Sequence, residues 1–416
     1  MNISVDATGP QARFVWQSAS DEIRERAPLT DKNMQAFQEA LAIKNPQIEK
    51  WNLRECDFTN SSAFQALLDL ITQNTYSGVT ELDLGACKFA NKHDFSRLLQ
   101  ALSSNQHFTR VGLSNYVCSD YLSQDGSLSL LLKANSTIQS LDLSGHSLEM
   151  EHVVDLTQGL NMNSTLQSLT LHSCYLDDVS ATVLMASALV QDSLKTLDLG
   201  ASNSFTPNFL NTIVANYLRE TKSLQTLVLD HSGSMFECSA AEIKPFIKAL
   251  RSNKTLKSLS LRYCRLSEAQ GEAILTALTI NDTLRSLDLE FTGFGLRDRG
   301  NEILIRVLPK WKGLQTLRLL THFSEHLAPA LIGALQRNSS LHHFSPRVTR
   351  KALGANEQVQ ALLQRNQQLS HAACLVNQSS TISPSVLPNA MARLSSTTSG
   401  AAATFQVLSF WAGDCV

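Results

Sequence analysis

The sequence predicts an α/β solenoid, in which short parallel strands alternate with helices and each strand–helix unit stacks on its neighbours. Three observations predict it. An apolar pattern, L-x-x-L-x-L, recurs along the chain at intervals of 27 to 32 residues. Within each interval the apolar spacing changes from two, which suits a strand, to three and four, which suits a helix. The chain has 416 residues, more than one globular core usually needs, and an elongated repeat array accommodates that length.

The N-terminal part precedes the repeats. Residues 1–28 are polar and poorly patterned, and we expect a flexible leader there. Met34, Phe37 and Leu41 then share one helical face, and the helix should end before Pro46. This helix suits the helical half of an incomplete first repeat, which would cap the apolar end of the stack.

About 11 repeats follow. Their first apolar residues are Ile48, Val79, Phe108, Ile138, Leu166, Leu194, Leu224, Leu256, Leu284, Leu314 and Leu341. The fourth and sixth positions of the pattern are two residues apart, so on a strand they point to the same side, which is the core. One unit cannot bury its apolar face alone, so neighbouring units stack. The expected form is a curved horseshoe with parallel strands on the concave face and helices on the convex face.

A second recurring position lies eight residues after each repeat begins. We expect the side chain there to turn in beneath the strand and to satisfy backbone groups of the loop. Small or hydrogen-bonding residues suit this role, and cysteine also tolerates burial. The residues at this position are Cys56, Cys87, Tyr116, His146, Cys174, Ser202, Ser232, Cys264, Thr292 and His322.

Five N-x-[S/T] sequences recur just after the predicted helices. They begin at Asn135, Asn163, Asn253, Asn281 and Asn338. In a secreted protein such sequences would indicate glycosylation. Their constant phase favours a structural role, in which asparagine adopts a left-handed helix cap and Ser or Thr serves the turn.

The pattern L-x-x-L-x-L-x-x-C, followed by a helix and A-L-x-x-N-x-[S/T]-L, resembles the ribonuclease-inhibitor-like leucine-rich repeats. Residues 249–256 and 277–284 carry the match, which extends over roughly residues 30–370. This subclass also forms the sensor regions of cytoplasmic immune receptors and the Ran GTPase-activating protein. The resemblance implies the horseshoe fold and a role in protein binding.

The expected domains are the leader at 1–28, a leucine-rich-repeat domain with its N-terminal helical cap at 29–370, and a tail at 371–416. The tail is rich in Ser and Thr and has two short helical patterns, so we expect a helical tail or cap. It resembles the end segment of many diatom leucine-rich-repeat proteins.

The composition limits which kinds of partner we expect. The net charge is -2 and charged residues make up 17% of the chain, which gives no electrostatic reason to expect nucleic acid or an anionic membrane. No apolar run is long enough for a transmembrane helix, and no secretory signal is apparent. The eight cysteines form no close pairs, which indicates free thiols in a reducing compartment. We therefore expect a cytoplasmic protein, with the nucleus as the alternative.

Residues His322 to His326 spell H-x-x-E-H, the inverted zincin pattern. A zincin needs both histidines on one helix, whereas here the run lies in the loop before a predicted helix. We therefore predict no metal, no cofactor and no enzymatic activity.

The best candidate for binding is a group of large and charged side chains in the later repeats. We predict that they lie on four consecutive strands, spaced about 4.8 Å apart, and form one patch. Tyr, Phe and Arg are the residue types that anchor protein interfaces. An ordinary solvated face is the alternative. The residues are Asp230, His231, Arg262, Tyr263, Glu290, Phe291 and Arg318.

The function that these features predict is a non-catalytic, monomeric scaffold that binds a partner protein on its concave face. Two alternatives remain open. One is a regulator of a small GTPase that resembles the Ran activator, although that family ends in a strongly acidic tail and this chain does not. The other is a recognition protein of the sensor or effector type.

Overall fold

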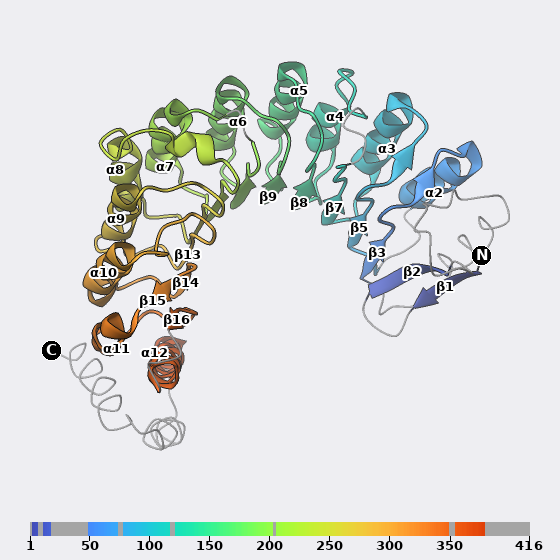
Figure 1. Ribbon diagram of the computed structural model, residues 1–416. Helices are drawn as coiled ribbons and strands as arrows, with labels where there is room; N and C mark the ends of the chain where they lie inside the picture. The colour runs from blue at the N-terminus through green and yellow to red at the C-terminus, as the bar shows by residue number, and fades with distance from the viewer. Residues whose placement is uncertain are drawn as a thin grey trace. The chain divides into compact units, whose positions relative to one another are not determined.

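The computed structural model describes residues 2–6, 11–17, 49–73, 78–116, 121–202, 205–348 and 354–378. The chain divides into two compact units, Met1–Met235 and Phe236–Val416. Each unit alternates strands and helices along the chain (Figure 1).

The first unit contains a sheet whose strands lie on one side and its helices on the other (Figure 1). In spatial order the strands are β1 (Asn2–Asp6), β2 (Gln11–Gln17), β3 (Lys50–Asn52), β5 (Glu81–Asp83), β7 (Arg110–Gly112), β8 (Ser140–Asp142), β9 (Ser168–Thr170), β10 (Thr196–Asp198) and β11 (Thr226–Val228). Strands β1 and β2 are antiparallel, and the other neighbouring pairs are parallel. Its helices are α2 (Ser61–Gln73), α3 (Lys92–Ser104), α4 (Ser127–Ala134), α5 (Met150–Leu160), α6 (Asp178–Val190), the π-helical η1 (Phe209–Val214) and α7 (Ala215–Glu220). Two short strands, β4 (Asp57–Phe58) and β6 (Lys88–Phe89), pair beside this sheet.

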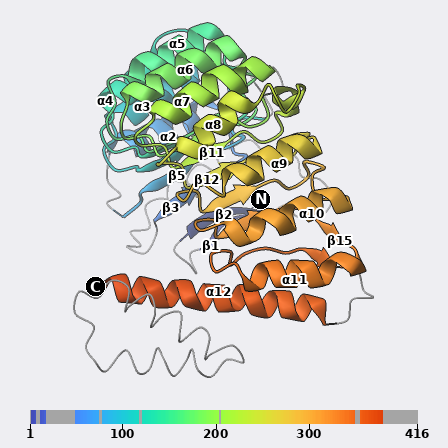
Figure 2. The same cartoon turned by 90° about the vertical axis from the view of Figure 1, so that its left-hand side faces the viewer.

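The second unit contains the parallel strands β12, β13 and β14, with the helices stacked beside them (Figure 2). Between the units in the sequence lies the 3-10 turn η2 (Gly233–Phe236). The strands are β12 (Ser258–Ser260), β13 (Ser286–Asp288), β14 (Thr316–Arg318) and the separate parallel pair β15 (His322–Phe323) and β16 (Arg347–Val348). The helices are α8 (Lys244–Ser252), α9 (Glu268–Ala277), α10 (Asp298–Val307), η3 (Leu308–Lys310), η4 (Glu325–Leu327), α11 (Ala328–Gln336) and α12 (Ala355–Gln378).

The apolar pattern forms the core of both units, as predicted. The middle residue of each triplet pairs with the middle residue of the next strand, for example Leu141 with Leu169 and Leu259 with Leu287. These four side chains are fully buried. The α/β leucine-rich-repeat fold is therefore confirmed.

The recurring position after each strand is buried in most repeats. Cys174 Sγ lies 3.2 Å from the carbonyl oxygen of Leu143, and a ring nitrogen of His146 lies 2.8 Å from that of Leu113. Burial raises the pKa of the Cys174 thiol to about 12 and lowers the pKa of His146 to about 4. These side chains therefore serve as neutral hydrogen-bonding core residues.

Two repeats depart from this rule. Tyr116 and His322 are exposed, and the preceding residues, Asn115 and Thr321, are buried instead. Most other repeats have a left-handed residue just before the buried position, whereas neither Asn115 nor Thr321 has a positive φ. Without that turn the inward side chain comes one residue earlier, so the prediction was wrong at Tyr116 and His322.

The recurring asparagines bridge neighbouring repeats. Asn281 Nδ2 donates to the carbonyl oxygens of Leu250 at 2.6 Å and Asn253 at 3.1 Å. Its Oδ1 accepts from the N–H groups of Thr283 at 3.0 Å and Leu284 at 2.9 Å. Equivalent bridges are made by Asn135, Asn163 and Asn338.

The structural interpretation of the N-x-[S/T] sequences is confirmed, but its reason was wrong. All five asparagines are buried. Their backbone is not left-handed where it caps a helix: Asn135 has φ -87° and ψ 127°, and Asn253 has φ -63° and ψ 136°. The side-chain amide forms the bridge between repeats, and an extended backbone places it within reach of the carbonyls of the preceding repeat.

The ends of the chain differ from the expected pattern. Strands β1 and β2 lie inside the predicted leader, and the sequence pattern did not predict them. The helix expected near residues 34–41 lies outside the described residues, as does the chain after Gln378. Helix α12 crosses the predicted boundary at 370. The flexibility of the leader and the capping role of the tail remain predictions.

We predict that Asn281→Ala lowers the free energy of unfolding by about 2–4 kcal/mol, because it leaves two buried carbonyls, the buried N–H of Leu284 and the part-buried N–H of Thr283 without their partner. Urea denaturation followed by circular dichroism measures the change. Thr276→Ala, at an exposed site on α9, is the control and should change stability by less than about 0.5 kcal/mol. Equal midpoints for the two variants would contradict the bridging role.

Candidate protein-binding surface

The predicted binding residues of the second unit lie where its strands end. Arg262 and Tyr263 follow β12, Glu290 and Phe291 follow β13, and Arg318 is the last residue of β14. Four of these five are thus in the turn beyond the strand rather than on it. The turn arises because Tyr263 has φ 57° and Phe291 has φ 58°, in the left-handed region, which a strand does not permit.

The left-handed turn belongs to the repeat, not to the aromatic residues. Residues with much smaller side chains adopt it at the same position elsewhere, including Ala86, Ser173 and Ala201. For a residue with a Cβ this conformation costs roughly 1–2 kcal/mol. The fold therefore needs a left-handed residue here and gains nothing from a large ring, so Tyr263 and Phe291 require another explanation.

The two rings stack in parallel. The centroids of Tyr263 and Phe291 lie 4.5 Å apart with an interplanar angle of 5°. Their residues remain 41% and 48% exposed, although the stack covers part of each ring. The guanidinium carbon of Arg262 lies 5.9 Å from each centroid, within the range of a cation–π contact.

An ion network supports the stack. Arg262 Nη2 lies 3.0 Å from Glu290 Oε2, and its Nε lies 3.8 Å from Asp288 Oδ2. Arg318 Nη1 lies 3.6 Å from the same Asp288 oxygen. Two arginines and two carboxylates thus hold one another beside the exposed rings.

Asp288 was missed in the sequence-based choice of site residues. Its Oδ1 accepts the N–H of Glu290 at 3.0 Å, and Asp83, Asp142 and Asp198 bind the equivalent amides in their own repeats. An aspartate between two leucines of the triplet is therefore a structural signal for the turn. At Asp288 the second oxygen also contacts Arg262 of the preceding repeat and Arg318 of the following repeat, and these arginines in the adjacent repeats could have indicated the contact.

The other two predicted residues lie in the first unit. The carbonyl of Asp230 accepts the N–H of Ala201 at 2.6 Å, and the His231 ring lies 6.4 Å from the His172 ring. His172 Nδ1 is 3.5 Å from Asp198 Oδ1. The hydrogen bond with Asp198 raises the pKa of His172, against the opposing effect of partial burial. The structure brings together the five predicted residues of the second unit. We call these five residues and Asp288 the aromatic patch.

The H-x-x-E-H sequence does not form a zincin helix. His322 lies in β15, whereas Glu325 and His326 lie in η4, and His326 Nε2 is 3.8 Å from Asp298 Oδ2. The part of the chain that the structure describes has no cluster of three His, Cys, Asp or Glu side chains arranged to hold a metal. No described helix combines the length and apolar character needed to cross a membrane.

Comparison with known proteins finds several relatives, some of them named for leucine-rich repeats (LRR), and no family model matches the chain. The "Capping protein, Arp2/3 and myosin-I linker protein 3" of Rattus norvegicus is 27% identical over 250 residues, 58% of this chain. The "NACHT, LRR and PYD domains-containing protein 9" of Bos taurus is 27% identical over 264 residues, 62% of this chain. Protein 12 of the same name from Mus musculus is 30% identical over 179 residues, 43% of this chain. The matched segments span only 17%, 22% and 14% of these relatives.

The solved structures are less similar to this chain in sequence identity. The leucine-rich repeat-containing protein LegL7 from Legionella pneumophila has a TM-score of 0.48 and 18% identity, over 72% of this chain and 93% of that one. A chain of the yeast Rad7 and Elc1 complex has a TM-score of 0.43 and 17% identity, over 78% and 85%.

We predict that Asp198→Asn lowers the pKa of His172 toward its ordinary value of about 6.5, because it removes the hydrogen-bonded carboxylate. A histidine whose folded pKa is raised stabilises the fold below its unfolded pKa, and this contribution is lost as pH rises through the folded pKa. Titration of the histidine ring signals by NMR measures the shift, with Asp282→Asn in the second unit as control. An unchanged His172 titration would contradict the pairing.

Proposed function

We propose that this leucine-rich-repeat protein is a non-catalytic interaction scaffold, and that its second unit holds a partner protein through the aromatic patch. The observation that carries the proposal is the exposed Tyr263–Phe291 stack. The repeat fold does not require these rings, and paired exposed aromatics are unfavourable in water unless something covers them.

The geometry suits an interface anchor. Two rings that are already stacked lose little conformational entropy when a partner covers them. Arg262 is held against both rings and against Glu290, so its guanidinium is also positioned in advance. Aromatic and arginine side chains of this kind dominate the energy of many protein interfaces.

The ion network would provide selectivity. Arg262, Arg318, Asp288 and Glu290 balance one another, so a partner must replace or extend these pairs to bind closely. A partner that buries one of the charges without pairing it would lose several kcal/mol. The rings thus supply affinity, and the charges reject poorly matched partners.

The finer assignments are part of the same proposal. We propose the ribonuclease-inhibitor-like subclass, a monomer, and a location in the cytoplasm or nucleus without nucleic acid or membrane as partner. The similarity to proteins named for NACHT, LRR and PYD domains supports a sensor-type recognition role as the second candidate. A GTP hydrolysis assay with purified small GTPases tests the regulator alternative, which predicts an increased rate.

We predict that the double variant Tyr263→Ala, Phe291→Ala loses its partner. The full chain and the variant are used to capture proteins, which mass spectrometry identifies, and affinity for the purified partner is then measured by calorimetry. The expected loss is at least about tenfold, which corresponds to about 1.4 kcal/mol.

Tyr175→Ala is the matched control, because Tyr175 is an exposed aromatic in the first unit with a similar φ of 56°. It should leave capture and affinity unchanged. Thermal melting of each variant excludes loss of the fold. Full affinity in the folded double variant would refute the aromatic patch as the binding surface.

A further inference from the structure

The ladder of hydrogen bonds between repeats breaks after β14. In the second unit the N–H of Leu261 donates to the carbonyl of Asp288, and the N–H of Leu289 donates to that of Arg318. Leu319 occupies the same position in the next repeat. Within the described part of the chain its N–H has no hydrogen-bond partner, although Leu319 is only 5% exposed. The next repeat would normally accept this N–H, so at Leu319 the amide is left for a partner from outside the ladder.

The sequence explains the break. By position in the repeat, the acceptor for Leu319 would be the carbonyl of Ser345. The chain still pairs at His343, whose carbonyl accepts the N–H of Leu317 at 2.9 Å. It then turns away at Ser345 and Pro346 to form β16, which pairs with β15 instead. Proline restricts the backbone of the residue before it and cannot donate to a ladder, so the strand opens there.

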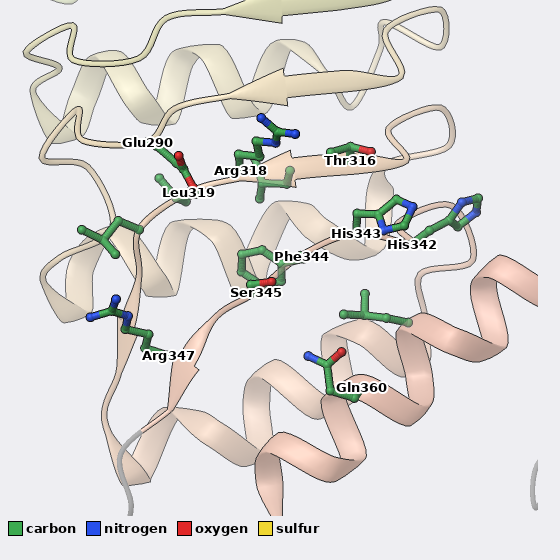
Figure 3. A pocket seen from close by; sticks show the side chains of 13 residues that line it. Glu290, Thr316, Arg318, Leu319, His342, His343, Phe344, Ser345, Arg347 and Gln360 are labelled. Atoms are coloured by element: carbon green, nitrogen blue, oxygen red, sulfur yellow. The ribbon is translucent and has the colours of Figure 1, made fainter. Parts of the chain in front are cut away.

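A pocket of about 670 Å³ fills the opening (Figure 3). Its lining comes from β14 and the residues after it, from the segment that includes Phe344 and Ser345, and from Gln360 on α12. Leu319 is among the lining residues. The volume falls in the usual range of ligand sites and accepts a short stretch of peptide.

The charged lining favours an anionic ligand. Arg318 and Arg347 are both exposed, and Glu290 is the one carboxylate in the lining. Glu290 is already paired with Arg262, and Arg318 with Asp288 at a longer distance of 3.6 Å. His342 and His343 also line the pocket. Among the arginines of the lining, Arg347 is therefore the one most available to form an ion pair with a ligand.

We propose that this pocket binds an extended acidic segment of the partner protein, with a backbone carbonyl on the Leu319 N–H and carboxylates on Arg347 and Arg318. The inference rests on the proposed function, because it specifies which part of a partner lies beside the aromatic patch. Strand addition supplies the backbone hydrogen bond, and arginine–carboxylate pairs supply the preference for acidic residues. Residues 379–416 of this chain contain a single acidic side chain, Asp414, so they do not match the ligand.

The test uses the full chain and fluorescein-labelled octapeptides in fluorescence anisotropy. A peptide of alternating Glu and Val should bind at least about tenfold more tightly than one of alternating Gln and Val, since each charged hydrogen bond contributes on the order of 1.5–3 kcal/mol. Hydrogen–deuterium exchange should slow in the fragment that contains Leu319 when the Glu peptide is present.

Arg347→Gln should weaken the Glu peptide about tenfold, by the same charged hydrogen-bond estimate. Arg347→Lys should retain part of the affinity, because it keeps the charge but not the two-pronged geometry. Arg251→Gln is the matched control, at an exposed position of α8 outside the pocket, and should have no effect. Circular dichroism verifies that each variant is folded.

Three results would overturn the inference: no binding of the Glu peptide, equal binding of the Gln peptide, or displacement by inorganic phosphate or oligo-dT at similar concentrations. The Tyr263→Ala, Phe291→Ala variant separates the two claims. If it loses the captured partner while Arg347→Gln leaves both partner and Glu peptide unaffected, the proposed function stands and the pocket assignment fails.

Discussion

Several junctions between repeats depend on one asparagine side chain that hydrogen-bonds to two repeats at once, at Asn135, Asn163, Asn281 and Asn338. Its amide nitrogen binds carbonyls of the preceding repeat, and its oxygen binds the two amides that lead into its own strand, as Asn281 shows. Both carbonyls and the Leu284 N–H are buried, so they need a hydrogen-bond partner inside the protein. At these junctions the side-chain amide thus fixes where one strand begins relative to the previous one, in register with the parallel ladder.

The aromatic patch inherits its geometry from this constraint. Since neighbouring strands start in register, the left-handed turns that end them also come side by side. Tyr263 and Phe291 occupy equivalent positions in adjacent repeats, and their rings therefore lie face to face. The fold already places equivalent positions of adjacent repeats side by side. One substitution per repeat is therefore enough to put a binding side chain next to its neighbour.

The fold could be predicted well from the sequence because the apolar period follows burial directly. The leucines of each triplet recur because all of them pack into the same core. Residue type selected five members of the patch together with Asp230 and His231 of the first unit. It did not reveal that four of the five follow the strands, because apolar spacing does not indicate a positive φ. Asp288 was missed since its role requires knowing that Arg262 and Arg318 converge on it. The break at Leu319 depends on Ser345 and Pro346, where a single proline redirects the chain against the repeat pattern.

The asparagine bridge also governs how such a chain can change length. Asn135 and Asn163 bind equivalent atoms of the repeats before them, at offsets of 33 and 31 residues to the first carbonyl. Removing or duplicating one whole repeat, from one asparagine to the next, joins a donor to an acceptor of the same kind. If a few residues are lost within a helix, the asparagine side chain no longer reaches the carbonyls of the preceding repeat. Variation by complete repeats is thus tolerated by the hydrogen bonding itself, and descendants of one chain can differ in repeat number while each remaining junction is preserved.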